Sequence, residues 1–393
     1  MTPLRVAHVI WWGEVGGIAL NLVDLARHAR TAGHAMSVVV LARSSPLIDA
    51  LSDHGVRVMP MGARSGRDLL ALARFARLLR RERFDVIHDH TGTFLAALAI
   101  RLGAAGARTI HQEHGAINVP RLRGKKRAFY RMFGRRFDRF IAVSRANASD
   151  MMRAGAAADR VITIPNAVDP ERFSPGPTRA DARRALGVPE TAATVGTACR
   201  LVPEKDLPLF LDVARIVRQA RPDVVFPVVG SGPEEEPLRR ACIERGLADA
   251  VRFPGVQSDM AAVWRAFDVY LFTSRVESFG RTLLEAQACE TPVVAAVPLE
   301  GGAIDLVRDS PGVVRVADRN ARELARLTLE LLERPERRAE MGRAGRRWVS
   351  AQYHVTDWVR QLDDVYRTGS RAHADTPTPP RNRETMEDIE ATR

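Results

Sequence analysis

The chain has 393 residues, and its 59 basic against 47 acidic side chains give a net charge of +12. This length accommodates two ordinary domains, and a composition of 46% hydrophobic and 27% charged residues excludes a disordered or fibrous chain. Cys199, Cys242 and Cys289 are too few and too scattered for a disulfide framework or a structural zinc site, which predicts a reducing compartment.

The positive charge indicates an anionic partner, such as a phosphorylated substrate, a membrane surface or nucleic acid. A general enrichment in Arg and Ala would produce the same total charge, so both interpretations stay open. The first predicted strand begins at residue 6, without the features of a signal peptide, and there is no apolar run of about 20 residues. We therefore expect a cytoplasmic protein that does not span a membrane.

Short β-rich runs alternate with helical patterns along the chain, which is typical of parallel α/β architecture. In the first half, a helix is expected at 67–82, and strands are expected at 6–12, 36–42, 56–61, 86–90, 108–114, 139–144 and 160–164. We assign residues 1–172 to a first doubly wound, Rossmann-like domain. Residues 173–190, which contain Ser174-Pro-Gly-Pro177, are predicted to form the interdomain linker.

A second series of alternating elements predicts another Rossmann-like domain over residues 191–350. Its strands are expected at 193–199, 224–229, 251–254, 269–273, 292–296 and 313–316, with helices at 319–334 and 337–349. Residues 351–368 are predicted to be a terminal helical segment that could pack back on the first domain. Residues 369–393 are polar and lack an apolar period, which predicts a disordered tail.

Two carboxylates, Glu277 and Glu285, flank a short segment that contains Phe279 and Gly280. A hydrophobic strand precedes this segment, and an apolar helix that the glycine would open follows it. The first N–H groups of such a helix have no partner within the helix and form an anion site. A carboxylate on each side suits a ligand that carries both phosphate and hydroxyl groups.

Other polar or glycine-rich segments also follow predicted strands, where ligands bind in doubly wound folds. They contain Gly16 and Gly17, the cations Arg200 and Lys205, Gly230, and Val256. The cations could neutralise a diphosphate, and the glycines allow close approach of backbone N–H groups. Tight turns and ordinary surface charge are the alternatives. The first glycine segment lacks the G-x-G-x-x-G pattern of NAD-binding proteins.

Four histidines, His88, His90, His111 and His114, flank the ends of two predicted strands. We reject a metal site because these strands are separate and no acidic ligands accompany the histidines with metal-binding spacing. His114 lies at the end of its strand, where it could contact a substrate. A structural hydrogen bond is the alternative role.

In their order and spacing, these segments resemble retaining GT-B glycosyltransferases of family 4 over about residues 1–365. The resemblance rests on the two glutamates with Phe279-Gly280 between them, and on Gly16-Gly17, His114, Val143-Ser144, Pro165-Asn-Ala-Val-Asp169, Arg200, Lys205 and Val229-Gly-Ser-Gly-Pro233. Cys199 and Ala167 depart from the family pattern, which commonly has glycine at both positions. Neither departure removes a side chain with a chemical role.

The resemblance implies a nucleotide-diphosphate sugar, UDP- or GDP-linked, as donor, with no metal and no cofactor. It implies that Glu277 and His114 contact the transferred sugar, that Arg200 and Lys205 hold the diphosphate, and that Glu285 binds the ribose. The remaining implied donor contacts are Gly16, Gly17, Gly230, Val256, Ser278, Phe279 and Gly280. The implied catalytic set is Glu277, His114, Arg200 and Lys205.

Nine basic residues lie within 121–139, interleaved with aromatic residues at helical spacing. This pattern is typical of a helix that contacts an anionic membrane surface, and equally of an aromatic core stripe with a solvated basic face. The candidate membrane contacts are Arg123, Lys125, Lys126, Arg127, Phe129, Tyr130 and Phe133. No nucleic-acid recognition motif accompanies the charge, so we expect no nucleic-acid partner.

The expected function is sugar transfer to a hydroxyl of a cell-envelope, lipid-linked or exopolysaccharide acceptor, such as lipopolysaccharide, on the inner face of the cytoplasmic membrane. A nucleotide-sugar epimerase of the same fold and a non-catalytic sugar-nucleotide-binding protein are the alternatives. A glycosidase with Glu277 as nucleophile is disfavoured by the Arg200 and Lys205 pair. A phosphorylase is disfavoured because no lysine site for pyridoxal phosphate is evident.

Overall fold

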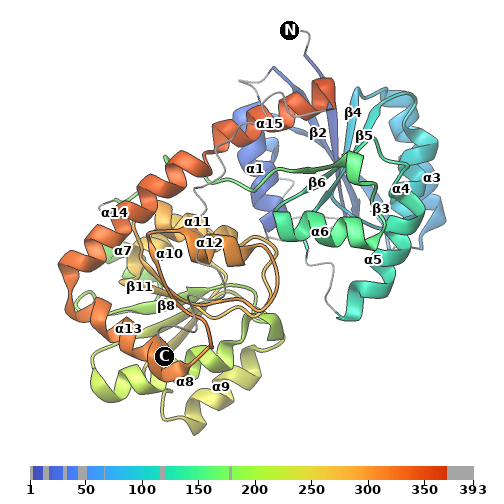
Figure 1. The fold of residues 1–393 in the computed structure, drawn as a ribbon. Helices are drawn as coiled ribbons and strands as arrows, with labels where there is room; N and C mark the ends of the chain where they lie inside the picture. Colours follow the sequence, from blue (N-terminus) through green and yellow to red (C-terminus); the bar gives the residue numbers. More distant parts are fainter. Residues whose placement is uncertain are drawn as a thin grey trace, which may run out of the picture.

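The computed structural model describes residues 3–11, 17–29, 33–42, 51–65, 67–115, 120–176 and 179–369, apart from the side chains of 29 and 120–123. The chain forms two lobes, each built on a parallel sheet with helices on both faces (Figure 1). The α/β fold expected from the sequence is confirmed. Gly16, the side chain of Arg123 and the tail beyond residue 369 lie outside the described part of the chain.

The first sheet has seven parallel strands in the order β3-β2-β1-β4-β5-β6-β7. They are β1 (Arg5–Ile10), β2 (Ala35–Ala42), β3 (Arg57–Ala63), β4 (Val86–Asp89), β5 (Arg108–Glu113), β6 (Arg139–Ala142) and β7 (Val161–Thr163). One face packs on α1 (Gly17–Ala29) and α15 (Val355–Thr368). The other face packs on α3 (Leu69–Glu82), α4 (Phe94–Gly103), α5 (Pro120–Phe133) and α6 (Arg145–Ala154).

The second sheet has six parallel strands in the order β10-β9-β8-β11-β12-β13. They are β8 (Val195–Ala198), β9 (Phe226–Val229), β10 (Val251–Gly255), β11 (Val269–Phe272), β12 (Val293–Ala296) and β13 (Val313–Val316). One face packs on α8 (Leu207–Ala220), α9 (Glu235–Glu244) and α13 (Ala321–Glu333). The other packs on α7 (Arg179–Ala185), α10 (Met260–Ala266), α11 (Arg281–Ala288), α12 (Ala303–Asp309) and α14 (Pro335–Gln352).

Every expected strand is present, with its ends shifted by at most a few residues. The linker prediction covered residues that also belong to the second domain. Helix α7 lies within that stretch, and Leu186 and Val188 after it are buried in the same core cluster as Trp264. The proline and glycine residues that suggested a linker precede this helix.

The last two helices cross from one lobe to the other (Figure 1). Helix α14 packs on the second domain, whereas α15 buries Trp358, Leu362 and Val365 in the core of the first. Between them, His354 pairs in a parallel bridge with Val168 of the interdomain connection. Two segments of the chain, one on each side of this bridge, therefore connect the domains side by side.

The aromatic residues of the basic segment face the protein core, which corrects their prediction as membrane contacts. Phe129, Tyr130 and Phe133 are at most 2% exposed, and their rings contact His111 of β5, Phe140 of β6 and Phe137. The alternation of basic and aromatic residues thus reflects a helix with one buried face. No helix in the described part of the chain is long and apolar enough to span a bilayer.

Candidate functional site

A cavity of about 500 Å³ lies between the two domains, at the carboxyl ends of strands from both sheets. The described residues predicted to form the site and found in its lining are Gly17, His114, Arg200, Lys205, Glu277, Ser278, Phe279 and Gly280. Gly230, Val256 and Glu285 lie outside this lining. The structure therefore brings the predicted cations and one of the two glutamates to a single interdomain site.

Lys205 and Glu277 form an ion pair in the cavity wall. Burial lowers the pKa of Lys205, but the neighbouring carboxylate of Glu277 more than offsets this effect, so that the pKa is raised and the lysine stays charged. The backbone carbonyl of Lys205 accepts a hydrogen bond from Thr273 Oγ1 at 3.0 Å, which ties its loop to the end of β11. The ammonium group is thereby held at a fixed position.

Helix α11 begins at the cavity, as the glycine pattern predicted. Gly280 adopts φ = 88° at the N-cap position, in the left-handed region that favours glycine. Gly280, Arg281 and Thr282 all line the cavity. The positive end of the helix therefore adds to the field of the two cations, which favours an anionic ligand.

Glu285, in contrast, is 2% exposed and lies behind the cavity wall. Its Oε1 accepts a hydrogen bond from Arg281 Nε at 2.7 Å, and its Oε2 accepts one from Trp264 Nε1 at 3.3 Å. Both oxygens are thus engaged within the second domain. A ribose contact by this carboxylate would have to share it with Arg281 or Trp264.

Arg281 links the two domains, and this role was not predicted from the sequence. Its guanidinium group pairs with Asp24 and donates a hydrogen bond to Asn21, both on α1 of the first domain. Asn21 also donates to Asn166 Oδ1 at 3.0 Å. Burial lowers the pKa of Arg281, but Asp24 and Glu285 outweigh burial and raise it. No sequence signal indicated Asn21 and Asp24, because a polar residue on an amphipathic helix is usually solvated.

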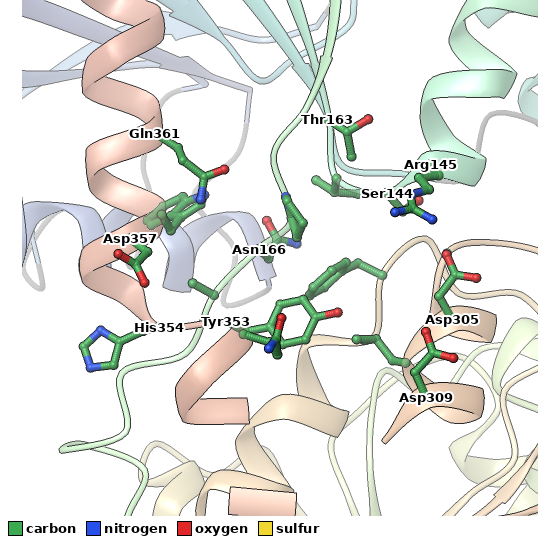
Figure 2. Close-up of a pocket in the computed structure, with 18 of the residues that line it drawn as sticks. Ser144, Arg145, Thr163, Asn166, Asp305, Asp309, Tyr353, His354, Asp357 and Gln361 are labelled. Carbon is green, nitrogen blue, oxygen red and sulfur yellow. The ribbon is translucent and has the colours of Figure 1, made fainter. Parts of the chain in front are cut away.

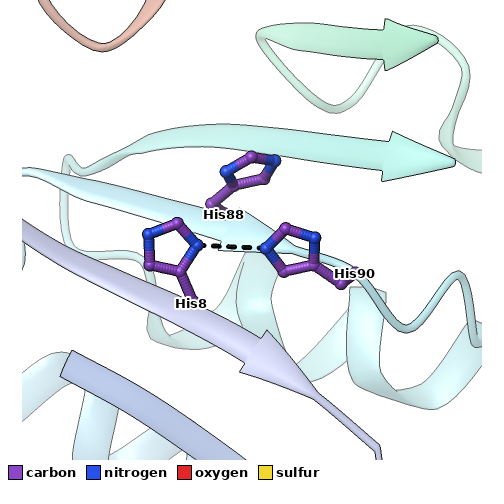
Figure 3. Close-up of side chains that lie close together, drawn as sticks. All are labelled: His8, His88 and His90. Carbon is purple, nitrogen blue, oxygen red and sulfur yellow. Dashed lines mark hydrogen bonds between the residues drawn. The ribbon is translucent and has the colours of Figure 1, made fainter. Parts of the chain in front are cut away.

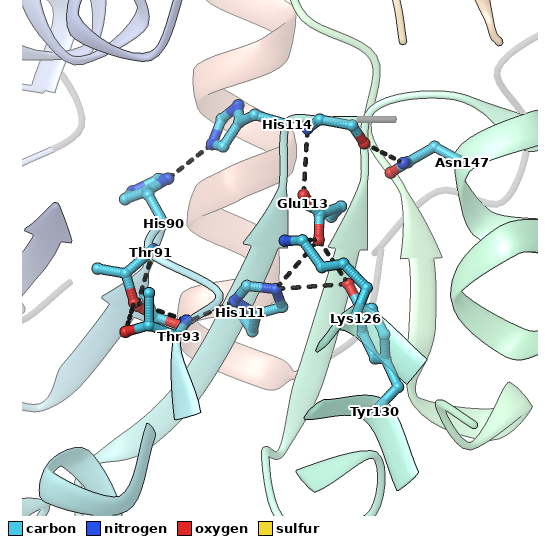
Figure 4. A network of polar contacts seen from close by, with 11 residues as sticks. His90, Thr91, Thr93, His111, Glu113, His114, Lys126, Tyr130 and Asn147 are labelled. Carbon is cyan, nitrogen blue, oxygen red and sulfur yellow. Dashed lines mark hydrogen bonds and ion pairs between the residues drawn. The ribbon is translucent and has the colours of Figure 1, made fainter. Parts of the chain in front are cut away.

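The loop that carries His114 is anchored by a buried polar network (Figure 4). Glu113 accepts hydrogen bonds from Tyr130 Oη at 3.0 Å and from the Gly115 N–H at 3.1 Å, and it pairs with Lys126. Burial raises the pKa of Glu113, but Lys126 and His111 outweigh burial and lower it well below its usual range. Lys126, predicted to contact a membrane, is instead a structural partner of the site.

Sequence comparison identifies the family. Residues 15–172 match the profile of "Glycosyltransferase Family 4", and residues 178–348 match that of "Glycosyl transferases group 1". A D-inositol 3-phosphate glycosyltransferase of Stackebrandtia nassauensis is 32% identical over 394 residues, covering 90% of this chain and 86% of the relative. The chain belongs to glycosyltransferase family 4.

A second relative of this glycosyltransferase is the GDP-mannose-dependent monoacylated alpha-(1-6)-phosphatidylinositol monomannoside mannosyltransferase of Corynebacterium glutamicum. It is 31% identical over 309 residues, covering 75% of this chain and 80% of the relative. Among solved structures, Anabaena HepE in complex with UDP and glucose superimposes with a TM-score of 0.82 at 23% identity, covering 93% of this chain and all of that chain. The expected GT-B fold is confirmed.

A second cavity of the glycosyltransferase, of about 370 Å³, lies on the other side of Phe279 and Asn166, which line both spaces. Asp305, Asp309 and Asp357 line it together with aromatic residues (Figure 2). Burial and the neighbouring Asp305 raise the pKa of Asp309. These carboxylates disfavour an anionic ligand, so the cavity with Arg200 and Lys205 is the better site for a phosphorylated donor.

Proposed function

We propose that this glycosyltransferase transfers a sugar from a nucleoside diphosphate to an acceptor hydroxyl, with retention of anomeric configuration and without a metal. The observation that carries the proposal is the convergence of Arg200, Lys205 and the N-terminus of α11 on one cavity beside Glu277. Departure of the nucleoside diphosphate builds negative charge on its phosphates. Two cations and a helix N-terminus stabilise that charge.

The assigned roles follow from these positions. Arg200 and Lys205 neutralise the diphosphate, and the N–H groups at Gly280 hold a phosphate or sugar oxygen. Glu277 accepts hydrogen bonds from sugar hydroxyls while it keeps Lys205 charged and in place. His114 contacts the sugar from the first domain, with Gly17 closing over the phosphates. Retention then follows from attack by the acceptor on the face that the leaving group vacates.

Glu285 is proposed to bind the ribose through the oxygen that Trp264 contacts at 3.3 Å, the longer of its two hydrogen bonds. Gly230 and Val256 stand at the ends of β9 and β10, beside the expected place of the nucleobase. A Cβ atom on Gly230 would lie 1.9 Å from the carbonyl oxygen of Cys199, so the glycine is required for these two loops to pack.

The proposed donor is UDP- or GDP-linked, because one relative is named for GDP-mannose and a structural neighbour was solved with UDP. For the acceptor we propose a phosphorylated or lipid-linked cell-envelope glycan. The two relatives are named for inositol phosphate and phosphatidylinositol mannoside acceptors, and Lys125 and Arg127 form an exposed basic face on α5. The proposed location is the inner face of the cytoplasmic membrane.

Metal independence has support in the distribution of ligands. Within the described ranges, the only group of three or more side chains that could hold a metal ion is His8, His88 and His90, and none of them lines the donor cavity. The cations of the cavity would do the work that a metal does elsewhere. Turnover with the identified donor is expected to be unchanged by EDTA.

A thermal-shift panel of UDP- and GDP-sugars tests the proposal, because a ligand that binds only the folded state raises its melting temperature. The stabilising donor is then incubated with the enzyme, with and without acceptor extracts, and free nucleoside diphosphate is measured. Release that depends on Lys205 supports transfer. Conversion of the donor to an epimeric nucleotide sugar, or binding without release under all conditions, would instead support one of the two alternatives.

A further inference from the structure

Three histidine rings are hydrogen-bonded in series from the interior of the first sheet to the donor cavity (Figures 3 and 4). His8 Nδ1 lies 3.0 Å from His90 Nε2, and His90 Nδ1 lies 2.8 Å from His114 Nε2. His8 is on β1, His90 follows β4 and His114 follows β5. His114 lines the cavity, and its Nδ1 is the nitrogen that the series leaves available to a ligand.

All three rings are held neutral. Burial lowers the pKa of His8 to about 3 and that of His114 to about 4, and it lowers the pKa of His90 well below its ordinary value. A neutral imidazole carries one N–H and one acceptor nitrogen. Each of the two hydrogen bonds therefore needs a donor on one ring and an acceptor on the next.

These contacts restrict the series to two states. If His8 donates from Nδ1, then His90 must carry its proton on Nδ1 and donate it to His114 Nε2, so His114 also carries its proton on Nδ1. If the direction is reversed, all three rings carry the proton on Nε2. The three histidines must therefore share one tautomer.

We propose that His90 and His8 are positioning residues that couple the tautomer of His114 to their own. This inference rests on the proposed function, in which His114 contacts the donor sugar. In one state His114 Nδ1–H donates to a sugar oxygen, and in the other its Nδ1 accepts from a hydroxyl. The series thus determines whether His114 Nδ1 is a donor or an acceptor, without placing a charge in the cavity wall. A change from one state to the other requires a proton to move on each of the three rings.

A metal site is the competing interpretation of the same region. The nitrogens of His8, His88 and His90 lie within 4.8 Å of one another. However, His8 Nδ1 and His90 Nε2 are already bonded to each other, and His88 Nδ1 bonds Tyr366 Oη at 2.8 Å. The His88 ring lies against His90 at an interplanar angle of 33° with ring centroids 4.2 Å apart, but it is not part of the series.

Histidine ring ¹⁵N and ¹H shifts of the full-length protein, at pH 7.5 and without ligand, test the coupling directly. We expect His8, His90 and His114, assigned by single substitution, to be neutral and to report the same tautomer. Two different tautomers within the series would overturn the proposal. One equivalent of bound zinc in the purified protein, with metal-shifted His8 and His90 signals, would also overturn it. The ring shifts do not depend on turnover, so this experiment can confirm the shared tautomer even if the proposed function is wrong.

A matched pair of variants separates the two hydrogen bonds. In His90→Asn the amide occupies the place of Nδ1 and keeps the contact with His114, whereas in His90→Gln it occupies the place of Nε2 and keeps the contact with His8. We expect His114 to populate both tautomers in His90→Gln, with kcat lowered about fivefold, as for loss of one neutral hydrogen bond, and KM for donor little changed. The Asn variant keeps a hydrogen-bond partner for His114 but loses the link to His8, so its kcat should fall less than that of His90→Gln.

His88→Phe is the control, because it keeps an aromatic ring against His90 and lies outside the series. Its His114 should keep the wild-type tautomer. An equal change of His114 in the His88 and His90 variants would mean that packing, rather than the series of hydrogen bonds, sets the tautomer, and the proposal would fail.

Discussion

Arg281 of the second domain forms a buried ion pair with Asp24 of the first domain, and the same guanidinium group holds Glu285 beside it. The side chains of Arg281 and Asp24 are 9% and 2% exposed. Asp24 also accepts a hydrogen bond from Arg172 at 3.1 Å. The same arginine therefore joins the first domain to the second and positions Glu285, the carboxylate proposed to bind the ribose.

Replacement of Arg281 by Ala is expected to destabilise the protein strongly, because it leaves Glu285 buried with only Trp264 and removes one of two cations from Asp24. Breaking a buried pair from one side costs about 3–5 kcal/mol. Urea unfolding followed by tryptophan fluorescence measures the effect. Asp24→Asn should cost less, because Arg281 keeps Glu285 as a counterion.

Arg326 provides the matched control, since it also pairs with two glutamates but lies on the exposed face of α13. Its replacement by Ala should leave the urea midpoint unchanged, because water solvates the partners that remain. If Arg281→Ala were no more destabilising than Arg326→Ala, the interdomain pair would not contribute to the free energy of unfolding.

The pair of Lys205 and Glu277 predicts an asymmetric response to mutation. Lys205→Ala removes one cation from the diphosphate and also leaves Glu277 as an uncompensated negative charge in the cavity. A charge-assisted hydrogen bond contributes about 1.5–3 kcal/mol, so donor affinity should fall by about 10- to 150-fold. Isothermal titration with the donor found in the thermal-shift panel measures this loss.

The double variant Lys205→Ala/Glu277→Gln distinguishes the two causes. It should regain part of the donor affinity, because the repelling charge is gone, but it should not regain turnover. Lys125→Ala, on the exposed face of α5, should bind the donor as the wild type does. Undiminished binding and transfer by Lys205→Ala would remove its assignment to the diphosphate.

The sequence predicted the strands and the segment from Glu277 to Gly280 because both depend on local patterns. Strand periodicity and a glycine at a helix start are visible within about ten residues. Which side chains contact one another across the fold cannot be predicted from such local patterns. The engagement of Glu285 by Arg281 and Trp264, and the contact of Arg281 with α1, depend on how two domains meet.

The basic aromatic segment shows the same limit at a single helix. Its spacing fits a membrane-facing and a core-facing stripe equally, and only the neighbouring strands decide that Phe129, Tyr130 and Phe133 are buried. The histidines are similar. Their positions predicted a polar contact for His114, but no pattern indicated that His8 would bond His90 across two strands.

The exposed basic residues of α5 predict a purely electrostatic contact with anionic lipid. Each Lys or Arg near such a surface contributes about 1 kcal/mol, so removing two should weaken binding roughly 30-fold, and reversing them further. Co-sedimentation of Lys125→Glu/Arg127→Glu with anionic vesicles tests this expectation. Arg240→Glu, a charge reversal on α9, should bind like the wild type. Equal binding of the wild type to neutral vesicles would contradict the electrostatic interpretation.

The buried histidines predict that stability falls below neutral pH, before carboxylates titrate. In the folded state the pKa of His8 is lowered to about 3 and that of His114 to about 4, because burial disfavours the charged rings. In the unfolded chain both regain a pKa near 6.5. The unfolded state therefore binds more protons between these values, and stability is fully present above about pH 6.5 and is lost as pH falls.

Each histidine that stays neutral while its unfolded counterpart is protonated costs about 1.4 kcal/mol per pH unit. Urea unfolding at pH 7.5, 6.5, 5.5 and 5.0 should show the free energy of unfolding decreasing steadily below pH 6.5. In His8→Asn the slope should be smaller by about one proton, whatever its absolute stability, because Asn does not titrate. A wild-type free energy of unfolding that stayed constant from pH 7.5 to 5.0 would show that the rings can take up protons within the fold, against the buried, neutral state that the series of hydrogen bonds requires.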